Sequence, residues 1–241
     1  MGKVIAVLSG KGGTGKSTAT AALACALSEL GRSVVCVDAD AELRNLDLCL
    51  GLGDQALRDY GAVLPGVCPL EKARVASPHY PTLRLLAAPP EPVREGFREL
   101  IGRLRQDYDY CFLDYPGGLG SVLEEAAELS DLVLMVVTAD PCSHRDAERT
   151  AQLLREKGCR EARLLMNRVN GKLLKSQEMT LDDSIDQVGL RLIGYVPEDS
   201  RVILALSQGL PLLRYGKDRR GAAAAFRRIA KRIDGQKVPI R

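Results

Sequence analysis

A glycine-rich segment near the amino terminus constrains the fold of this chain more than any other feature. Residues 10–17 read Gly-Lys-Gly-Gly-Thr-Gly-Lys-Ser, which satisfies the pattern G-x-x-x-x-G-K-[ST]. The segment follows the apolar run Val4–Leu8, which predicts a strand, and it opens the helical pattern Lys16–Leu30. Glycines let successive backbone N–H groups point inward around a phosphate, and the N-terminus of the helix adds its dipole. This order of strand, loop and helix predicts an α/β fold with a phosphate-binding loop, the P-loop.

Two side chains of the P-loop carry the chemistry of a nucleotide site. Lys16 brings a positive charge to the β- and γ-phosphates, and the hydroxyl of Ser17 is placed to bind Mg²⁺. A glycine-rich turn without a ligand would require neither residue. We therefore expect nucleotide contacts from Gly10, Lys11, Gly12, Gly13, Thr14, Gly15, Lys16, Ser17 and Thr18.

The rest of the chain alternates short apolar runs with helical patterns. Strands are expected at Val4–Leu8, Ser33–Asp38, Leu83–Ala87, Tyr110–Asp114, Leu132–Thr138, Arg163–Met166 and Leu190–Tyr195. Helices are expected at Lys16–Leu30, Val93–Gln106, Ser121–Leu129, Ser143–Lys157 and Arg220–Ile233. Because several strands are apolar on both faces, we predict a doubly wound, mostly parallel sheet with helices on both faces, in a single domain spanning residues 1–241. Seven of the twelve prolines lie between Pro65 and Pro92, which indicates a structured excursion around one strand.

Composition argues against several classes of protein. No apolar run approaches the ~20 residues of a membrane-spanning helix, and the apolar stretch after Lys3 is too short for a signal peptide, so we expect a cytoplasmic protein. The seven cysteines form no CxxC or CxC pair and are expected to be reduced core residues. His79 and His144, the only histidines, are expected at the surface or at helix starts, which leaves little from which to build a zinc site or histidine-based catalysis.

Acidic residues end two of the expected strands. Asp38 and Asp40 follow the run Val34–Val37, and Asp114 follows four apolar residues in Tyr110–Asp114. An acid at the carboxyl edge of such a strand is the Walker B pattern, which holds Mg²⁺ through water. We therefore expect Ser17 and Asp114 to contribute to a metal site, to which the resemblance described next adds Asp38.

A second lysine, Lys11, lies inside the P-loop, and this deviant form of the loop resembles that of the MinD/ParA family of dimerising ATPases. The resemblance implies ATP and Mg²⁺ as ligands and a homodimer that forms around ATP. It implies that Lys11 reaches the phosphates of the partner's nucleotide and that Lys16 acts within its own chain. It also implies that Asp38 lies near the Mg²⁺ shell and that Asp40 orients the attacking water. Lys11, Lys16 and Asp40 are thus the expected catalytic residues.

The resemblance extends to both switch segments. Residues 43–48, Leu-Arg-Asn-Leu-Asp-Leu, are similar to switch I of the MinD branch. The turn Pro116-Gly117-Gly118 after Asp114 is similar to switch II, whose backbone N–H groups sense the γ-phosphate, and Gly118 matches its glycine. Glu42 stands where the family commonly has Gly. Tyr115 stands where it usually has Ser, Thr or Cys.

Two later segments are similar to the base pocket of the family. Asn167 and Arg168 follow the expected strand Arg163–Met166, and an Asn amide can pair with both a donor and an acceptor of an adenine edge. Residues 194–199 follow the next strand, where the turn containing Pro197 and Asp199 can wall the purine. Adenine is the base that this pattern favours.

The carboxyl-terminal part of the chain is basic. From Arg201 to Arg241 it has 11 Lys and Arg residues against 2 acids. The expected helix Arg220–Ile233 places Phe226, Ile229, Ala230 and Ile233 on one stripe, which we expect to pack on the sheet. The outward charges then predict weak, reversible, salt-sensitive association with anionic membranes, peripheral at the inner face of the cell membrane.

The resemblance implies a slow switch ATPase of the MinD type that acts in division-site placement. The resemblance implies a MinC-like division inhibitor and an ATPase-activating partner. A ParA-like DNA-partitioning ATPase or a flagellar-number regulator remains an alternative, because either could use the basic face on DNA. A metal-cluster maturation ATPase fits less well without paired cysteines, and a P-loop transferase would need a substrate pocket that the sequence does not reveal.

Overall fold

The computed structural model describes residues 1–55, 58–118, 122–171, 181–215 and 220–240. The strands are β1 (Lys3–Leu8), β2 (Val34–Asp38), β3 (Arg74–Ala76), β4 (Leu83–Leu86), β5 (Tyr110–Asp114), β6 (Leu132–Thr138), β7 (Ala162–Val169) and β8 (Leu192–Pro197). The α-helices are α1 (Lys16–Glu29), α2 (Leu46–Cys49), α3 (Tyr60–Val63), α4 (Leu70–Ala73), α5 (Phe97–Asp107), α6 (Val122–Leu129), α7 (Pro141–Glu156), α9 (Leu181–Val188), α10 (Arg201–Ser207) and α11 (Gly221–Ile233). Short 3₁₀ turns cover Gly53–Gln55 and Leu212–Arg214.

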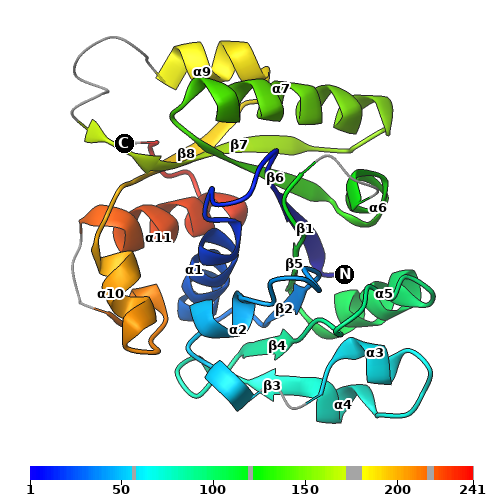
Figure 1. Cartoon of the computed structure of the whole chain (residues 1–241). Coiled ribbons are helices and arrows are strands. Elements are labelled where there is room, and N and C mark those ends of the chain that lie inside the picture. Colours follow the sequence, from blue (N-terminus) through cyan, green and yellow to red (C-terminus); the bar gives the residue numbers. More distant parts are fainter. Residues whose placement is uncertain (56–57, 119–121, 172–180, 216–219, 241) are drawn as a thin grey trace.

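The strands form one sheet with the order β3-β4-β2-β5-β1-β6-β7-β8 (Figure 1). Every neighbouring pair is parallel except β3 and β4, which are antiparallel. The strand that leads into the P-loop therefore lies near the middle of the sheet, with β5 on one side and β6 on the other. This arrangement confirms the predicted doubly wound α/β fold.

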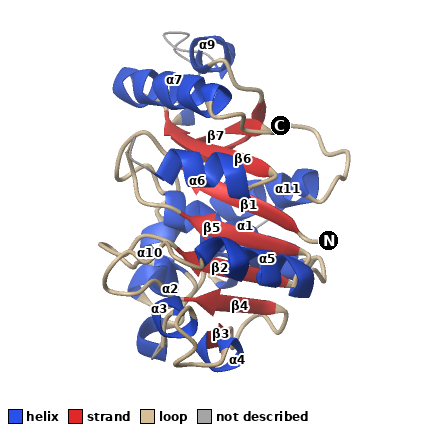
Figure 2. Cartoon of the chain, turned by 90° about the vertical axis from the view of Figure 1, so that its right-hand side faces the viewer, coloured by secondary structure: helices blue, strands red, loops and turns tan. Residues whose placement is uncertain are grey.

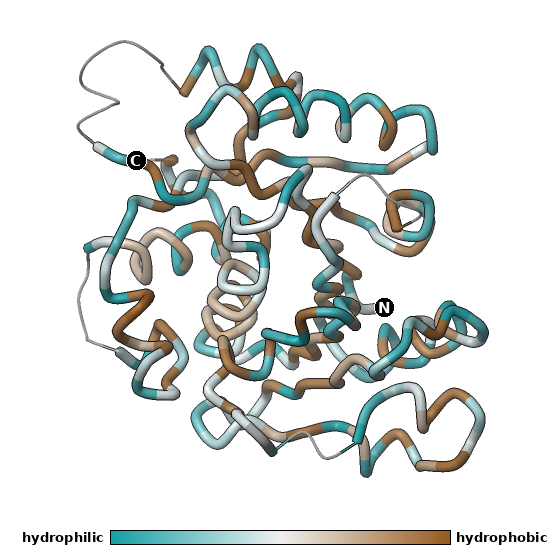
Figure 3. Tube along the Cα trace, in the orientation of Figure 1, coloured by the Kyte–Doolittle hydropathy of each residue, from teal (hydrophilic) through white to brown (hydrophobic). Residues whose placement is uncertain are grey.

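Helices cover both faces of the sheet (Figures 1 and 2). Alternate residues of β1 point to opposite sides: Ile5 and Val7 join the core under α1 and α11, whereas Val4 and Ala6 join the core under α5, α6 and α7. The central strands are coloured as hydrophobic along most of their length in Figure 3, as expected for strands buried on both faces.

Helix α1 is buried almost all round because α11 packs beside it. Its small residues, which include Ala19, Ala22 and Ala26, meet an alanine-rich first half of α11. The predicted stripe of α11 is buried, with Phe226 and Ile229 each 1% exposed, which confirms that this helix packs on the sheet.

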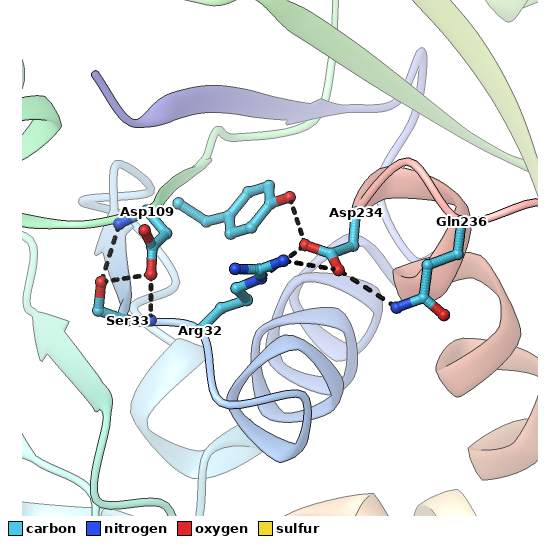
Figure 4. A network of polar contacts seen from close by, with 6 residues as sticks. Arg32, Ser33, Asp109, Asp234 and Gln236 are labelled. Carbon is cyan, nitrogen blue, oxygen red and sulfur yellow. Dashed lines mark hydrogen bonds and ion pairs between the residues drawn. The ribbon is translucent and has the colours of Figure 1, made fainter.

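A polar network at the end of the sheet away from the P-loop ties three distant segments together (Figure 4). Asp234, next to the end of α11, accepts hydrogen bonds from Arg32 Nε at 2.8 Å and from the hydroxyl of Tyr110 at 3.0 Å. Asp109 accepts from the backbone N–H and the hydroxyl of Ser33, each at 2.8 Å. These contacts fix the end of α11 against the starts of β2 and β5.

Several boundaries differ from those expected. Helix α5 begins at Phe97 rather than at residue 93, because Gly96 has a φ of 77° and interrupts helical geometry. Helix α7 begins at Pro141, because Asp140 caps it by accepting the N–H of Ser143. The expected start of a helix at Ser121 lies outside the described residues, and α6 is described from Val122.

The last two strands also extend beyond their predicted ends. Strand β7 continues through Asn167 and Arg168 to Val169, so these residues lie in an irregular strand end and not in the loop after it. Strand β8 begins at Leu192 and runs to Pro197, so the expected turn at residues 194–199 is mostly strand. The pairing of Val169 with Pro197 holds the two ends together.

Of two expectations about individual residue types, the one for His144 is confirmed and the one for the cysteines is wrong in part. His144 lies in the first turn of α7, as expected of a helix-start residue, and it is fully buried. Four cysteines are buried as predicted, whereas Cys49 and Cys159 are partly buried and Cys142 is exposed. Among the described helices, none has the length and apolar composition needed to cross a bilayer.

Candidate functional site

The P-loop connects β1 to α1 in a conformation that depends on glycine. Gly13 and Gly15 have φ values of 78° and 90°, which side chains disfavour. A Cβ atom at Gly15 would lie 2.4 Å from Nδ2 of Asn167, and one at Gly10 would lie 2.4 Å from Cβ of Asp146 on α7. The glycines thus provide both the turn and the room for two neighbouring elements to touch the loop.

Lys16 and Ser17 open α1, and Thr20 lies one turn further along. Lys16 is buried, and the hydroxyl of Thr20 lies 3.0 Å from the carbonyl oxygen of Lys16 and 3.0 Å from Oδ1 of Asp114. Sequence reasoning missed Thr20. Its spacing of four residues from Lys16 on a predicted helix is the signal that could have found it, because such residues share a face.

Two carboxylates meet at the carboxyl edge of the sheet. Asp38 and Asp114 are in register on the adjacent strands β2 and β5 and are 3% and 1% exposed. Burial raises the pKa of Asp38 to about 7, and the negative charge of Asp114 adds to the effect. Burial also raises the pKa of Asp114 to about 6, although a hydrogen bond from Ser17 and the charge of Lys16 oppose it. Two buried acids that repel each other form an environment that a cation would stabilise.

The fit of this site to Mg²⁺ follows from its donor set. Ser17, Asp38 and Asp114 come together as the sequence predicted, with hard oxygen donors beside the P-loop. In the described part of the chain, no group of three or more His, Cys, Asp and Glu side chains forms a complete cation cage. Mg²⁺ is commonly held by one or two carboxylates plus phosphate oxygens and water, so the residues present fit a nucleotide-bound Mg²⁺.

The segment that leads into switch I begins directly after Asp38. Asp38 accepts the backbone N–H of Asp40 at 3.0 Å and that of Leu46 at 3.3 Å, while Asp40 accepts the N–H of Leu43 at 3.1 Å. Arg44 adopts a φ of 46°, an uncommon value for a residue with a side chain. Asp38 therefore shapes the segment that carries Asp40, the predicted water-orienting residue, which is 6% exposed.

Lys11 is held within its own chain. Its Nζ lies 2.9 and 3.1 Å from the two carboxylate oxygens of Asp140, which also accepts from Thr138 at 2.6 Å and from the N–H of Ser143 at 2.9 Å. Burial alone raises the pKa of Asp140, but the bonds from Thr138, Lys11 and Ser143 outweigh it and lower the value to about 2. Sequence reasoning missed Asp140, which is separated from Lys11 by 129 positions.

Switch II packs on the P-loop through backbone atoms. A Cβ atom at Gly117 would lie 3.1 Å from the backbone nitrogen of Gly12, so this approach is close. Gly118 has a φ of 113°, and its N–H donates to the carbonyl oxygen of Ser9 at 3.1 Å. The N–H that is predicted to sense a γ-phosphate is thus bonded to the strand end that precedes the loop.

A cavity of about 460 Å³ extends from the P-loop, and its volume is in the range of small-molecule sites. The predicted base-pocket residues line it together with the loop: Gly13, Gly15, Thr18, Asn167, Arg168, Pro197 and Asp199. Nδ2 of Asn167 donates to the carbonyl oxygen of Thr14 at 2.8 Å, so one of its N–H groups is used to position the loop.

The other predicted base-pocket residues have contacts of their own. Arg168 has a φ of 55° and pairs with Glu198 at 3.1 Å. Asp199 accepts from Arg201 at 2.8 Å and from the N–H of Ala222 at 2.9 Å, so its carboxylate anchors the start of α11. Its contribution to the cavity is therefore tied to the position of that helix.

Comparison with known proteins places this site in a family. The CobQ/CobB/MinD/ParA nucleotide binding domain matches residues 5–212. The septum site-determining protein MinD of Synechocystis is 34% identical over 246 residues, which cover 100% of this chain and 92% of that protein. A structure of the MinC:MinD cell division protein complex of Aquifex aeolicus matches with a TM-score of 0.92 and 33% identity, covering 99% of this chain and 98% of the other.

A third relative was solved with a nucleotide. The septum site-determining protein MinD of Pyrococcus horikoshii, complexed with Mg-ADP, matches with a TM-score of 0.85 and 28% identity over 97% of this chain and 96% of the other. The family match covers most of the chain, and the relatives are similar along nearly its whole length. The chain belongs to the CobQ/CobB/MinD/ParA nucleotide-binding family, in its MinD branch.

Proposed function

We propose that this chain is a single ATPase domain that binds Mg-ATP, dimerises around it, hydrolyses it slowly and acts as a switch in division-site placement. One observation carries the proposal: the P-loop, the carboxylate pair and the 460 Å³ cavity converge at one edge of the sheet. The full-length similarity to septum site-determining proteins supports the cellular role.

Each group in the site has a part in this proposal. Lys16 and the loop N–H groups bind the phosphates, and Asn167 with the turn at Pro197 encloses adenine. Ser17, Asp38 and Asp114 would hold Mg²⁺, directly or through water. Mg²⁺ held there would supply positive charge beside the phosphates. Asp40 accepts a hydrogen bond from the attacking water and orients it toward the γ-phosphate.

The Lys11–Asp140 ion pair gives the switch a resting state. In a single chain the charge of Lys11 is balanced by Asp140, and both side chains are partly exposed, at 37% and 39%. In the proposed dimer Lys11 leaves Asp140 and reaches the phosphates of the partner's nucleotide. Dimerisation then requires a phosphate charge strong enough to replace the carboxylate, which makes the dimer depend on ATP.

The partner proposed for the ATP-bound dimer is a MinC-like division inhibitor, since a MinC:MinD complex is among the similar structures. An ATPase-activating partner completes the cycle by returning the dimer to single chains. Association with anionic membranes would be weak and peripheral, at the inner face of the cell membrane.

The test is to identify what co-purifies with the protein when a non-hydrolysable ATP analogue and Mg²⁺ trap it. We expect a MinC-like inhibitor in the trapped sample and not in a sample with ADP. Lys16→Ala, which should not bind nucleotide, is the control: any partner that co-purifies with it binds without the ATP-bound state. Recovery of duplex DNA in place of a division inhibitor, with the same dependence on nucleotide, would move the assignment to DNA partitioning.

A further inference from the structure

A second cavity, of about 300 Å³, lies among helices that cover the face of the sheet opposite α1. Its walls come from the start of α5, from α3 and from α6, which lie on the same side of the sheet in Figure 2. Residues 39–42, which lead into switch I, and residues 115–117, which lead into and include part of switch II, also line it. The cavity therefore touches both segments that respond to the nucleotide.

Aromatic rings form the inner wall of this cavity. Tyr60, Phe97 and Tyr115 all line it, and each is at most 3% exposed. The rings of Tyr60 and Phe97 are 5.3 Å apart between centroids and tilted by 50°. These are three of only seven Tyr and three Phe residues in a chain without Trp, so aromatic surface is concentrated here.

The polar lining of the cavity is acidic. Asp40, Glu42 and Glu125 line it, against Arg94 as the one basic residue of the lining. The hydroxyl of Tyr115 is buried, and the carboxylate of Glu125 lies near it. A positively charged group that donates N–H hydrogen bonds would give a partner both to the hydroxyl oxygen of Tyr115 and to the carboxylate of Glu125.

We propose that this cavity accepts a guanidinium or ammonium group on an aliphatic stem, presented by an arginine or lysine side chain of a partner polypeptide. The aromatic rings attract a cation through their faces and pack on the stem. Glu125 supplies a charge-assisted hydrogen bond to the N–H groups. An anionic group would be repelled by three carboxylates, and a neutral apolar group would leave Tyr115 and Glu125 without a new partner.

Occupation of this cavity would be coupled to the nucleotide. A cation that contacts Glu42, directly before switch I, and the backbone at Gly117 in switch II binds differently when ATP rearranges these segments. This step rests on the proposed function. By linkage, the factor by which nucleotide changes the affinity for the cation equals the factor by which the cation changes the affinity for nucleotide.

A matched pair of small ligands tests the binding step. L-argininamide carries the guanidinium, whereas L-citrullinamide has nearly the same shape without the charge. In ligand-observed NMR titrations we expect L-argininamide to bind in the millimolar range and about tenfold more tightly than L-citrullinamide, from the loss of a charge-assisted bond and a cation–π contact. Equal binding of the two ligands would overturn the proposal.

Two variants locate the bound cation. Glu125→Gln should lower the affinity for L-argininamide by about tenfold, because it keeps the shape and removes the charge. Glu124→Gln is the matched control on the same helix, since Glu124 pairs with Lys157 outside the cavity and its loss should leave affinity unchanged. Equal losses in both variants would show general surface attraction and contradict the site. Tyr115→Phe keeps the ring and should weaken binding about threefold, through loss of one hydrogen bond.

The coupling step has its own readout. With saturating non-hydrolysable ATP analogue and Mg²⁺, the affinity for L-argininamide should change by about fivefold or more. Unchanged affinity in a sample shown to contain bound nucleotide would overturn the coupling. Failure to bind nucleotide at all, with cation binding intact, would instead count against the proposed ATPase function and leave the cavity assignment standing.

Discussion

Position 15 has room for a hydrogen atom and nothing larger. Asn167 donates to the carbonyl oxygen of Thr14 and lies against Gly15, so a residue 153 positions away holds the P-loop in shape. The same amide lines the cavity predicted for the base. The side chain of Asn167 thus connects the phosphate end of the site to its base end. The geometry at both ends depends on this one residue.

Replacement of each of the two lysines of the P-loop should remove a different activity. Lys16→Ala removes the phosphate charge within the chain and should abolish nucleotide binding. Lys11→Ala should leave binding by the single chain largely intact and prevent ATP-driven dimerisation. Nucleotide titration and size measurements with and without ATP separate the two results. A Lys11→Ala protein that dimerises like the parent would remove the proposed role across the interface.

Asp40→Ala should bind Mg-ATP and dimerise but barely turn over, because it removes water orientation and leaves the phosphate contacts in place. Asp114→Ala should instead weaken Mg²⁺-dependent binding. Phosphate release and nucleotide affinity, measured on both variants, distinguish the roles. Turnover at the parental rate in Asp40→Ala would move the catalytic assignment, with Asp38 as the next residue to test.

Asp140→Asn tests the resting ion pair. The pKa of Asp140 is lowered from 3.8 to about 2, so its stabilising effect is present above pH 3.8 and is lost as pH falls through about 2. At pH 7 we expect a loss of about 0.5–1 kcal/mol, since the pair is over one third exposed and screened by solvent, and since Asn can still cap α7. Urea unfolding from pH 7 to pH 2.5 should show the variant and the parent converging.

The same variant should dimerise with ATP at lower protein concentration, because Lys11 no longer has to leave a carboxylate. Thr138→Val is a useful comparison, since it removes one bond to Asp140 and keeps the ion pair. If the Asp140→Asn protein requires more ATP or more protein to dimerise than the parent, Lys11 does not exchange Asp140 for the phosphates of the partner's nucleotide.

At the scale of elements, the sequence predicts the long buried strands well. The expected strands Tyr110–Asp114 and Leu132–Thr138 have the observed bounds, because each is an apolar run buried on both faces. The three-residue edge strand β3 was not predicted, since its side chains are partly exposed and it is too short to show a period. The one-turn helices α2, α3 and α4 were missed because four residues are too few to show a helical period. Helix α3, for example, depends on a local cap from Asp59.

Candidate site residues can be predicted from the sequence where they lie close together in it. The P-loop is one continuous segment, so its pattern names the residues directly. Asp140 could not be found this way, because its role depends on a contact with Lys11 across 129 positions. The extension of β7 through Asn167 was also hidden, since it depends on an irregular pairing with β8 near Arg168.

At the scale of the whole molecule, the basic carboxyl-terminal region is partly neutralised by the fold. Arg227 pairs with Glu29 at 2.6 Å, and Arg201 pairs with Asp199 at 2.8 Å. Arg232 donates to the carbonyl oxygen of Ile193. Lys231 is exposed. In the described part of this region, several positive charges are therefore paired within the fold, while Ile203, Leu204 and Leu206 of α10 are exposed apolar side chains.

We accordingly expect weak liposome binding that requires anionic lipid, strengthens when ATP doubles the basic surface, and disappears by several hundred millimolar salt, since each charge contributes about 1 kcal/mol near the membrane. Vesicle sedimentation at increasing salt checks this. Tight binding to neutral vesicles at high salt would show apolar insertion. Absence of binding to anionic vesicles with any nucleotide, together with ATP-dependent duplex binding, would favour DNA partitioning over division-site placement.

The contacts of Asp234 have a consequence for the order of folding. This residue lies just beyond the last helix, yet it bonds to Arg32, 202 positions earlier, and to Tyr110, 124 positions earlier. Such long loops close late, so these bonds should be absent from the folding transition state. Asp234→Asn should speed unfolding about tenfold and leave the folding rate nearly unchanged. Stopped-flow kinetics measure both rates, and Asp107→Asn, which removes an exposed ion pair, is the control. The expected result would mean that α11 docks last during folding and separates first during unfolding.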